Sequence, residues 1–231
     1  MKRVLCLAGF ADGAAMYENL MATGFAQTHE VIPVDLPGFA GLSAKPLRPA
    51  SLHALADWVD GKVRKASADT LMAHSVASII ASLAAAKPGS PVDTLISLEG
   101  NLTAEDAYFS GRAAQYDDAA RFKSEFLSLI EKRGALDPIL KRYANIAQTA
   151  DAQAMWELGC DAAKFSSQHH PGELLQASGR VIYVYNPDNC AKVSMDWLET
   201  SALEPIRLDG ASHWPSIDAA EQLSAQLLQA L

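Results

Sequence analysis

Short runs of apolar residues alternate along the chain with longer stretches in which apolar positions recur at helical spacing. The apolar runs are rich in Val, Ile and Leu and are bounded by Gly, Pro or Asp, which is typical of buried strands. The pattern predicts six strands, at residues 4–7, 31–34, 70–73, 94–98, 181–185 and 205–208. Pro33 lies in the second run and favours an edge strand there, because proline has no backbone N–H to donate.

Helical patterns separate most of these strands. Ser51 is a candidate N-cap for a helix whose apolar positions continue to Val59. A second helical pattern covers residues 78–86 and stops at Lys-Pro-Gly, and a third runs from about Ser216 to Leu231. Strands that alternate with helices indicate βαβ units and a mostly parallel sheet.

Residues 101–180 interrupt this alternation, because they contain helical patterns and no strand-like run. One predicted helix ends in Glu-Lys-Arg-Gly at 131–134, where cations and a glycine suit a helix C-terminus. The next begins at Asp137 and Pro138, which suit an N-cap and a first helical position. The sequence therefore predicts a single sheet domain, residues 1–231, with an all-helical insertion within it.

Composition narrows the class of protein. The 231 residues are 49% hydrophobic and 20% charged, which is typical of a soluble globular chain. The formal net charge of −8 argues against a binder of nucleic acid or anionic membrane, which needs an excess of Lys and Arg. No apolar stretch reaches the roughly 20 residues that span a bilayer, and the apolar run after Met1 is too short for a signal peptide. Three scattered cysteines without a CxxC pair suit a reducing compartment, so we expect a cytoplasmic protein.

The candidate nucleophile is Ser75, in the sequence Ala-His-Ser-Val-Ala at residues 73–77. This motif lies between a predicted strand and a predicted helix, where a tight turn projects the hydroxyl from the end of the sheet. The residues two positions before and after the serine must be small, because the turn brings strand and helix close together. Both are alanine here. We expect His74 to point away from the site and to pack rather than to take part in the chemistry.

A nucleophilic serine needs a general base, and the candidate is His213. It lies in Asp-Gly-Ala-Ser-His-Trp-Pro at residues 209–215, after the last predicted strand and before the last helix. A histidine on that loop can reach over the carboxyl edge of the sheet, where ligands bind in open α/β folds. No Gly-rich nucleotide motif occurs, and no ligands at zinc-like spacing accompany His169 and His170, so no cofactor and no metal is expected.

Four motifs, in this order along the chain, resemble those of the α/β-hydrolase superfamily. They are Leu-Ala-Gly-Phe at 7–10, Val-Asp-Leu-Pro-Gly-Phe at 34–39, and the two motifs that carry Ser75 and His213. The resemblance implies an α/β-hydrolase fold, with a mostly parallel sheet flanked by helices. It also implies that the helical insertion corresponds to the cap, which is the most variable part of this family.

The same resemblance implies roles for individual residues. Ser75 would be the nucleophile and His213 the general base. The backbone N–H groups of Phe10 and Val76 would form the oxyanion hole, which stabilises negative charge in the transition state. Alanine and glycine precede Phe10 where many members of the family have histidine and glycine.

The acid of the triad stays open between two residues. The family often places it after the strand before last, where Asp188 stands one position before the expected slot, which holds Asn189. A subset of the family places the acid after the preceding strand, and that slot holds Glu99. Either carboxylate could orient the imidazole and stabilise its charged form, and we favour Glu99 slightly.

These residues predict a serine hydrolase that cleaves a small carboxylic ester or related acyl substrate through an acyl-enzyme. A serine nucleophile argues against the dehalogenase and epoxide-hydrolase branches, which use aspartate. Hydrolysis of a C–C bond or a thioester by the same triad is an alternative, and so is a ligand-binding protein with little turnover. The expected partner is a small-molecule substrate, with no nucleic acid and no membrane.

Overall fold

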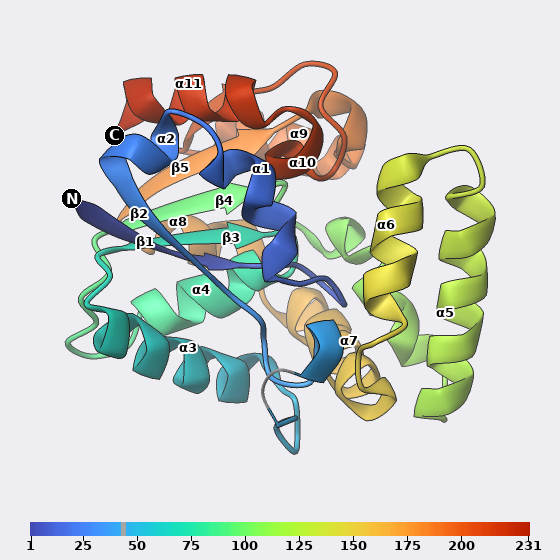
Figure 1. Ribbon diagram of the computed structural model, residues 1–231. Coiled ribbons are helices and arrows are strands. Elements are labelled where there is room, and N and C mark those ends of the chain that lie inside the picture. The colour runs from blue at the N-terminus through green and yellow to red at the C-terminus, as the bar shows by residue number, and fades with distance from the viewer. Residues whose placement is uncertain (43–44) are drawn as a thin grey trace.

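A six-stranded sheet forms the centre of the computed structural model, which describes residues 1–42 and 45–231 (Figure 1). The strand order is β2-β1-β3-β4-β5-β6, and every neighbouring pair runs parallel. The strands are β1 (Lys2–Leu7), β2 (His29–Val34), β3 (Thr70–His74), β4 (Thr94–Leu98), β5 (Arg180–Tyr185) and β6 (Glu204–Arg207). The sequence predicts all six to within two residues at each end, so the expected parallel sheet is confirmed.

Helices lie on both faces of this sheet (Figure 1). On one face α3 (Leu52–Ala66) packs against α4 (Ala77–Ala85). The other face carries α1 (Glu18–Met21), α2 (Phe25–Thr28), α10 (Pro215–Asp218) and α11 (Ala220–Ala230). The predicted N-cap of α3 is confirmed, since the Ser51 side chain accepts a hydrogen bond from the Ala54 N–H. No helix in the described part of the chain is long and apolar enough to cross a bilayer.

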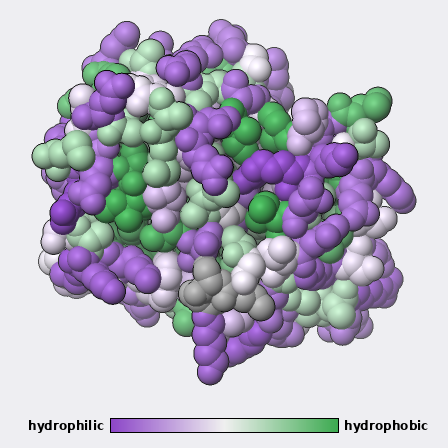
Figure 2. All heavy atoms as spheres, viewed as in Figure 1, coloured by the Kyte–Doolittle hydropathy of each residue, from purple (hydrophilic) through white to green (hydrophobic). Residues whose placement is uncertain are grey.

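The strand with the internal proline is an edge strand, as predicted. β2 pairs only with β1 and places Pro33 opposite Cys6. Its side chains are mostly half-buried, whereas every residue of the central strands β3 and β4 is buried. Figure 2 shows hydrophobic side chains gathered over this edge of the sheet, at the left of the view, and a second group near the middle of the same face. A proline at the edge leaves no ladder hydrogen bond unmade inside the sheet.

Between β4 and β5 the chain forms helices only, all in the described part of the chain. The α-helices are α5 (Ala119–Arg133), α6 (Pro138–Ala147), α7 (Ala152–Gln168) and α8 (Pro171–Gln176), preceded by the 3-10 helices η3 (Ala104–Ala107) and η4 (Ser110–Gln115). The predicted caps are present: Asp137 accepts hydrogen bonds at the start of α6, and Gly134 ends α5. α5 and α6 stand beside each other at one end of the sheet (Figure 1).

The structure differs from the sequence prediction near the C-terminus. The helix expected from about Ser216 to Leu231 is two helices, because the backbone of Ala219 leaves the helical region with φ −125° and ψ 29°. The elements that were not predicted include α1 and α2, which have four residues each, η1 (Ala14–Tyr17), and α9 (Lys192–Thr200), which connects β5 to β6. The first three are too short to show a complete apolar period.

Candidate active site

Ser75 lies on a strained turn between β3 and α4. Its φ is +55°, in the left-handed region that side chains other than glycine and asparagine rarely adopt. Hydrogen bonds hold this conformation: the Ser75 N–H donates to the Leu98 carbonyl at 2.9 Å, and the Ser75 carbonyl accepts from the N–H and the hydroxyl of Ser78. Strain of this kind persists where the surroundings fix it, and it concentrates at functional sites. The turn presents the serine side chain at the carboxyl end of the sheet.

The loop after β1 approaches this turn closely. A Cβ atom placed on Gly9 would lie 2.6 Å from Nδ1 of His74 and 3.1 Å from Cβ of Ser75. The first distance is shorter than any normal contact, so only glycine fits here without a shift of the histidine ring. This approach brings Phe10 into the wall of the cavity that Ser75 lines.

His213 lines the same cavity as Ser75. The loop that carries it is held on both sides: the Ser212 N–H donates to Asp218 Oδ2 at 2.8 Å, and the Trp214 N–H donates to the Ser212 hydroxyl at 3.1 Å. A third bond joins His74 Nε2 to the His213 carbonyl at 2.7 Å. A carbonyl can only accept, so Nε2 of His74 carries the proton. The structure therefore brings the predicted nucleophile Ser75 and the predicted base His213 to the same cavity from distant parts of the chain.

The expectation that His74 points away from the site is wrong. Its ring lines the cavity with Ser75 and lies 4.7 Å from the ring of His213, centroid to centroid. Burial, and after it the neighbouring His213, lowers the pKa of His74 to about 3. The ring is therefore neutral, and its contact with the His213 carbonyl fixes the loop of that residue. The tight turn at Ser75 lets the end of β3 face the loop after β6.

Of the two candidate acids, Glu99 lies beside His213. Its Oε2 is 3.7 Å from His213 Nδ1, and its side chain is 2% exposed. Glu99 directly follows β4 at a φ of +50°, and its N–H donates to the Val184 carbonyl at 2.8 Å. The central strands β3 and β4 thus end in the same way, with a residue at positive φ whose N–H bonds to the next strand. Asp188, the other candidate, is exposed and does not line the cavity of Ser75.

Two asparagines occupy the region where the sequence suggested an acid. The Asn186 N–H and the Asn189 side-chain amide both donate to Glu99 Oε1, at 2.6 and 3.2 Å. The side-chain amides of Asn186 and Asn189 also donate to the Ala211 carbonyl, in the loop that carries His213. The residue in the expected acid slot, Asn189 at the end of η5 (Pro187–Asn189), therefore binds the carboxylate that approaches from the neighbouring strand. One indication of this arrangement is present in the sequence, since the position where the family often has the acid holds Asn189 and not a carboxylate.

Burial is the main cause of the shifted pKa values of Glu99 and His213. It raises the pKa of Glu99 to about 8, although the hydrogen bonds from Asn186 and Asn189 oppose this shift. It lowers the pKa of His213 to about 4, and the carboxylates of Asp106 and Asp12 oppose that shift. Both changes favour the neutral forms near pH 7. No group in the described chain makes a hydrogen bond to His213 Nδ1, and Glu99 Oε2 at 3.7 Å is the carboxylate oxygen that faces this nitrogen.

The two residues implied as oxyanion donors flank the serine turn. Val76 directly follows Ser75 and lies at the N-terminus of α4, and Phe10 follows the glycine that approaches the turn. Within the described residues, neither backbone N–H donates a hydrogen bond to another protein group. Free N–H groups at a helix N-terminus and in a loop are the kind of donor that stabilises developing negative charge.

Aromatic side chains close the cavity over Ser75. The sheet side contributes Phe10 and Trp214, and the helical insertion contributes Tyr108, Phe109 and Tyr143. The cavity has about 10 Å³ of accessible space, enough for about one water molecule. A substrate must therefore displace part of this wall, and Tyr108, which is 40% exposed, lies at its outer side.

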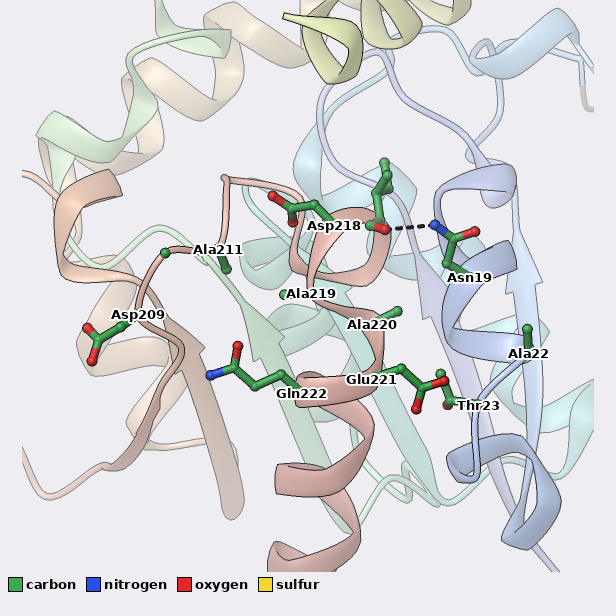
Figure 3. A pocket seen from close by; sticks show the side chains of 12 residues that line it. Asn19, Ala22, Thr23, Asp209, Ala211, Asp218, Ala219, Ala220, Glu221 and Gln222 are labelled. Atoms are coloured by element: carbon green, nitrogen blue, oxygen red, sulfur yellow. Dashed lines mark hydrogen bonds between the residues drawn. The ribbon is translucent and has the colours of Figure 1, made fainter.

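A larger hollow lies outside this site. It has a volume of about 610 Å³ and runs between α1 and the start of α11 (Figure 3). Figure 3 shows Asn19 bound to the Ile217 carbonyl, with Glu221 beside Thr23 on the same side of α11 and Gln222 on the opposite side, toward Asp209 and Ala211. Neither Ser75 nor His213 lines this hollow. The volume of a cavity therefore does not identify the candidate active site here. The convergence of a serine, a histidine and a carboxylate identifies it.

The paired histidines of the insertion do not form a metal site in the structure. His169 packs against Phe165, and His170 packs against Trp197 with ring centroids 5.0 Å apart. Among the described residues, no group of three or more His, Cys, Asp or Glu side chains is arranged to hold a metal ion.

Comparison with solved structures agrees with this fold. An esterase from Thermogutta terrifontis superposes with a TM-score of 0.74 at 15% identity, covering 100% of this chain and 89% of its own. An esterase from Exiguobacterium antarcticum gives 0.75 at 13% identity, covering 100% and 91%. A variant of AqdC, solved with its substrate in a study of ring cleavage of the Pseudomonas quinolone signal, gives 0.77 at 15% identity, covering 99% and 90%.

Comparison of the sequence itself gives one family. The model of the alpha/beta hydrolase family matches residues 4–226. The search of the curated proteins found no match.

Proposed function

Because the chain belongs to the alpha/beta hydrolase family, we propose that it is a serine hydrolase that cleaves a small carboxylic ester or a related acyl compound. One arrangement carries this proposal. Ser75, held at positive φ, shares a cavity with His213, and Nδ1 of His213 lies 3.7 Å from the buried carboxylate of Glu99. A nucleophile, a base and an orienting acid in that relation are the components of acyl transfer by a serine enzyme.

The first half of the reaction forms an acyl-enzyme. Ser75 Oγ attacks the carbonyl carbon of the substrate while His213 Nε2 takes the hydroxyl proton. The carbonyl oxygen gains negative charge and accepts hydrogen bonds from the N–H groups of Phe10 and Val76. His213 then gives its proton to the leaving alcohol, and the acyl group stays on Ser75.

The second half releases the acid. His213 takes a proton from a water molecule, whose oxygen attacks the acyl carbon, and the oxyanion uses the same two N–H groups. Collapse returns the proton to Ser75 and frees the carboxylic acid. In both halves Glu99 orients the imidazole and stabilises its charged form. The separation of 3.7 Å between Nδ1 and Glu99 is longer than a hydrogen bond, so the two groups must approach each other as Nε2 takes the proton and the ring becomes charged.

The substrate consistent with this cavity has a small acyl group. Its walls are mainly aromatic and leave about 10 Å³ of space, so a bulky acid portion would require large movements of the helical insertion. Thioester and C–C bond hydrolysis proceed through the same three residues. A ligand-binding protein with little turnover would keep the cavity without acylating Ser75.

Labelling with a fluorophosphonate probe tests the proposal. The serine hydroxyl attacks the phosphorus of the probe and expels fluoride, which leaves a phosphonylated serine whose P=O oxygen takes the position of the oxyanion. The folded wild-type chain is expected to be labelled at Ser75 and to hydrolyse an activated ester, and Ser75→Ala is expected to do neither. A folded wild-type chain that is not labelled would favour the binding protein and contradict the hydrolase.

The pH dependence of kcat/KM is expected to follow Glu99. The carboxylate must be ionised to stabilise the imidazolium, and burial raises its pKa to about 8, so kcat/KM should rise with pH through that value. His213, with a pKa lowered to about 4, is already neutral near pH 8. It therefore adds no inflection to the profile of kcat/KM against pH near its ordinary pKa of 6.5. A pH series of initial rates measures this. Glu99→Gln should lose this rise, and an inflection near 6.5 in both proteins would contradict the assignment.

A further inference from the structure

Asp12 is a buried carboxylate two residues after the proposed oxyanion donor Phe10. Its side chain is 1% exposed. Oδ1 accepts the Gly13 N–H at 2.8 Å, and Oδ2 accepts the indole N–H of Trp214 at 2.9 Å. Nη1 of Arg142 donates to both oxygens at 3.1 Å. A carboxylate removed from water needs such donors, and here every donor comes from the protein.

These donors belong to three different parts of the molecule. Gly13 lies in the loop after β1 that also carries Phe10. Trp214 directly follows His213, and Arg142 lies on α6 of the helical insertion. Asp12 is therefore the point at which three segments meet: the loop after β1, which carries Phe10 and is called the oxyanion loop below, the loop that carries His213, and the helical insertion.

A second set of contacts joins the same three parts. The Tyr143 hydroxyl donates to the Phe10 carbonyl at 2.7 Å, and the ring of Tyr143 lies 5.0 Å from that of Trp214. Tyr143 follows Arg142 on α6 and is buried. α6 thus holds the oxyanion loop at two points, through Asp12 and through the carbonyl of Phe10.

We propose that Asp12, together with Arg142 and Tyr143 of α6, is a positioning group. It holds the Phe10 N–H and His213 at the relative positions that acyl transfer requires. This inference rests on the proposed function. None of the three side chains exchanges a proton or forms a bond with substrate. Their effect is geometric, because a displacement of about 1 Å at reacting groups costs about 100-fold in rate.

The same contacts tie the geometry of the site to the position of the insertion. A substrate must displace part of the wall formed by Tyr108, Phe109 and Tyr143. When α6 moves, the bonds to Asp12 and Phe10 break, and the oxyanion donor is no longer fixed. The site is therefore complete only while α6 keeps these contacts.

Turnover and inhibition give the first test. Asp12→Asn, Arg142→Met and Tyr143→Phe are each expected to lower kcat about 10- to 100-fold and to change KM less than about threefold. Affinity for a trifluoromethyl ketone, which forms an oxyanion on Ser75, should fall by the same factor as kcat/KM. Two matched controls should keep wild-type values. Arg48→Met breaks another ion pair to the insertion, with Asp151, and Tyr116→Phe removes another hydroxyl of the insertion, bound to Glu125.

Hydrogen exchange gives a second test that does not depend on turnover. In Asp12→Asn and Arg142→Met, the amides of residues 138–147 and 209–214 should exchange faster together, and Arg48→Met should change neither. Arg142→Met and Tyr143→Phe carry the test if Asp12→Asn does not fold. Equal losses in the controls, a change in KM alone, or faster exchange confined to the loop after β1 would overturn the inference. A wild-type chain without turnover would contradict the proposed function, and the exchange data would still decide the coupling.

Discussion

Replacing Ser75 by alanine is expected to lower kcat for an activated ester such as p-nitrophenyl acetate by at least about 10⁴-fold. The alanine keeps the fold, because the bonds that hold the turn within the described residues come from the backbone of Ser75 and not from its hydroxyl. What it removes is the atom that would carry the acyl group. Initial rates with the purified variant measure the loss, and circular dichroism checks the fold. Turnover within tenfold of wild type would show that another group performs the chemistry.

Ser75→Gly is the matched variant for this experiment. It should be as inactive as Ser75→Ala, but more stable than Ser75→Ala by about 1 kcal/mol, since glycine adopts φ near +55° without strain. Urea unfolding of the two variants measures the difference. A glycine variant no more stable than the alanine variant would contradict the strained turn. The result would separate the energetic cost of the turn from its role in presenting the nucleophile.

Replacing Glu99 by glutamine is expected to lower kcat by about 10⁴-fold, whereas Asp188→Asn should stay within about threefold of wild type. Glutamine keeps the shape of the side chain and can still accept from the Asn186 N–H, but it cannot stabilise a charged imidazole. Asp188 is exposed and lies away from the cavity, so its amide should have no effect on His213. Rates with the same ester compare the two variants. The opposite order would assign the acid to Asp188.

Stability distinguishes this loss of activity from a damaged fold. Burial raises the pKa of Glu99 from 4.5 to about 8, so its contribution to folding is full below pH 4.5 and is lost as the pH rises through 8. Glu99→Gln has no carboxylate to ionise. We therefore expect it to be more stable than wild type at pH 9, measured by urea unfolding, and to lose that advantage near pH 5. An unchanged difference between the two pH values would contradict the raised pKa.

The placement of the acid shows where reading the sequence reaches its limit. Glu99 and Asp188 stand after neighbouring strands of a parallel sheet, so both ends are near the same edge, and sequence alone favours Glu99 only slightly. The structure separates them by a backbone detail. Glu99 is at positive φ with its N–H bonded to β5, whereas Asp188 is exposed in η5. The amides of Asn186 and Asn189 then hold Glu99 beside the loop of His213.

Asp12 shows a different limit. In the sequence it is one aspartate in a glycine-rich loop, and nothing in its neighbours indicates burial. Its partners Arg142 and Trp214 lie 130 and 202 positions away, and only the folded chain brings them together. His74 was misjudged for the same reason, since the position of its ring depends on the loop after β6.

The sequence by itself determined the six strands, the interruption between the fourth and fifth strands, and the candidate serine and histidine. Local spacing is sufficient for these, because strands, helices and tight turns have characteristic periods and residue preferences. Only the tertiary structure decided which carboxylate lies beside His213, how little space the cavity has, and that a buried aspartate joins three segments. Those features depend on contacts between residues far apart in the chain, and on burial, which changes the cost of every charge and every unpaired polar atom.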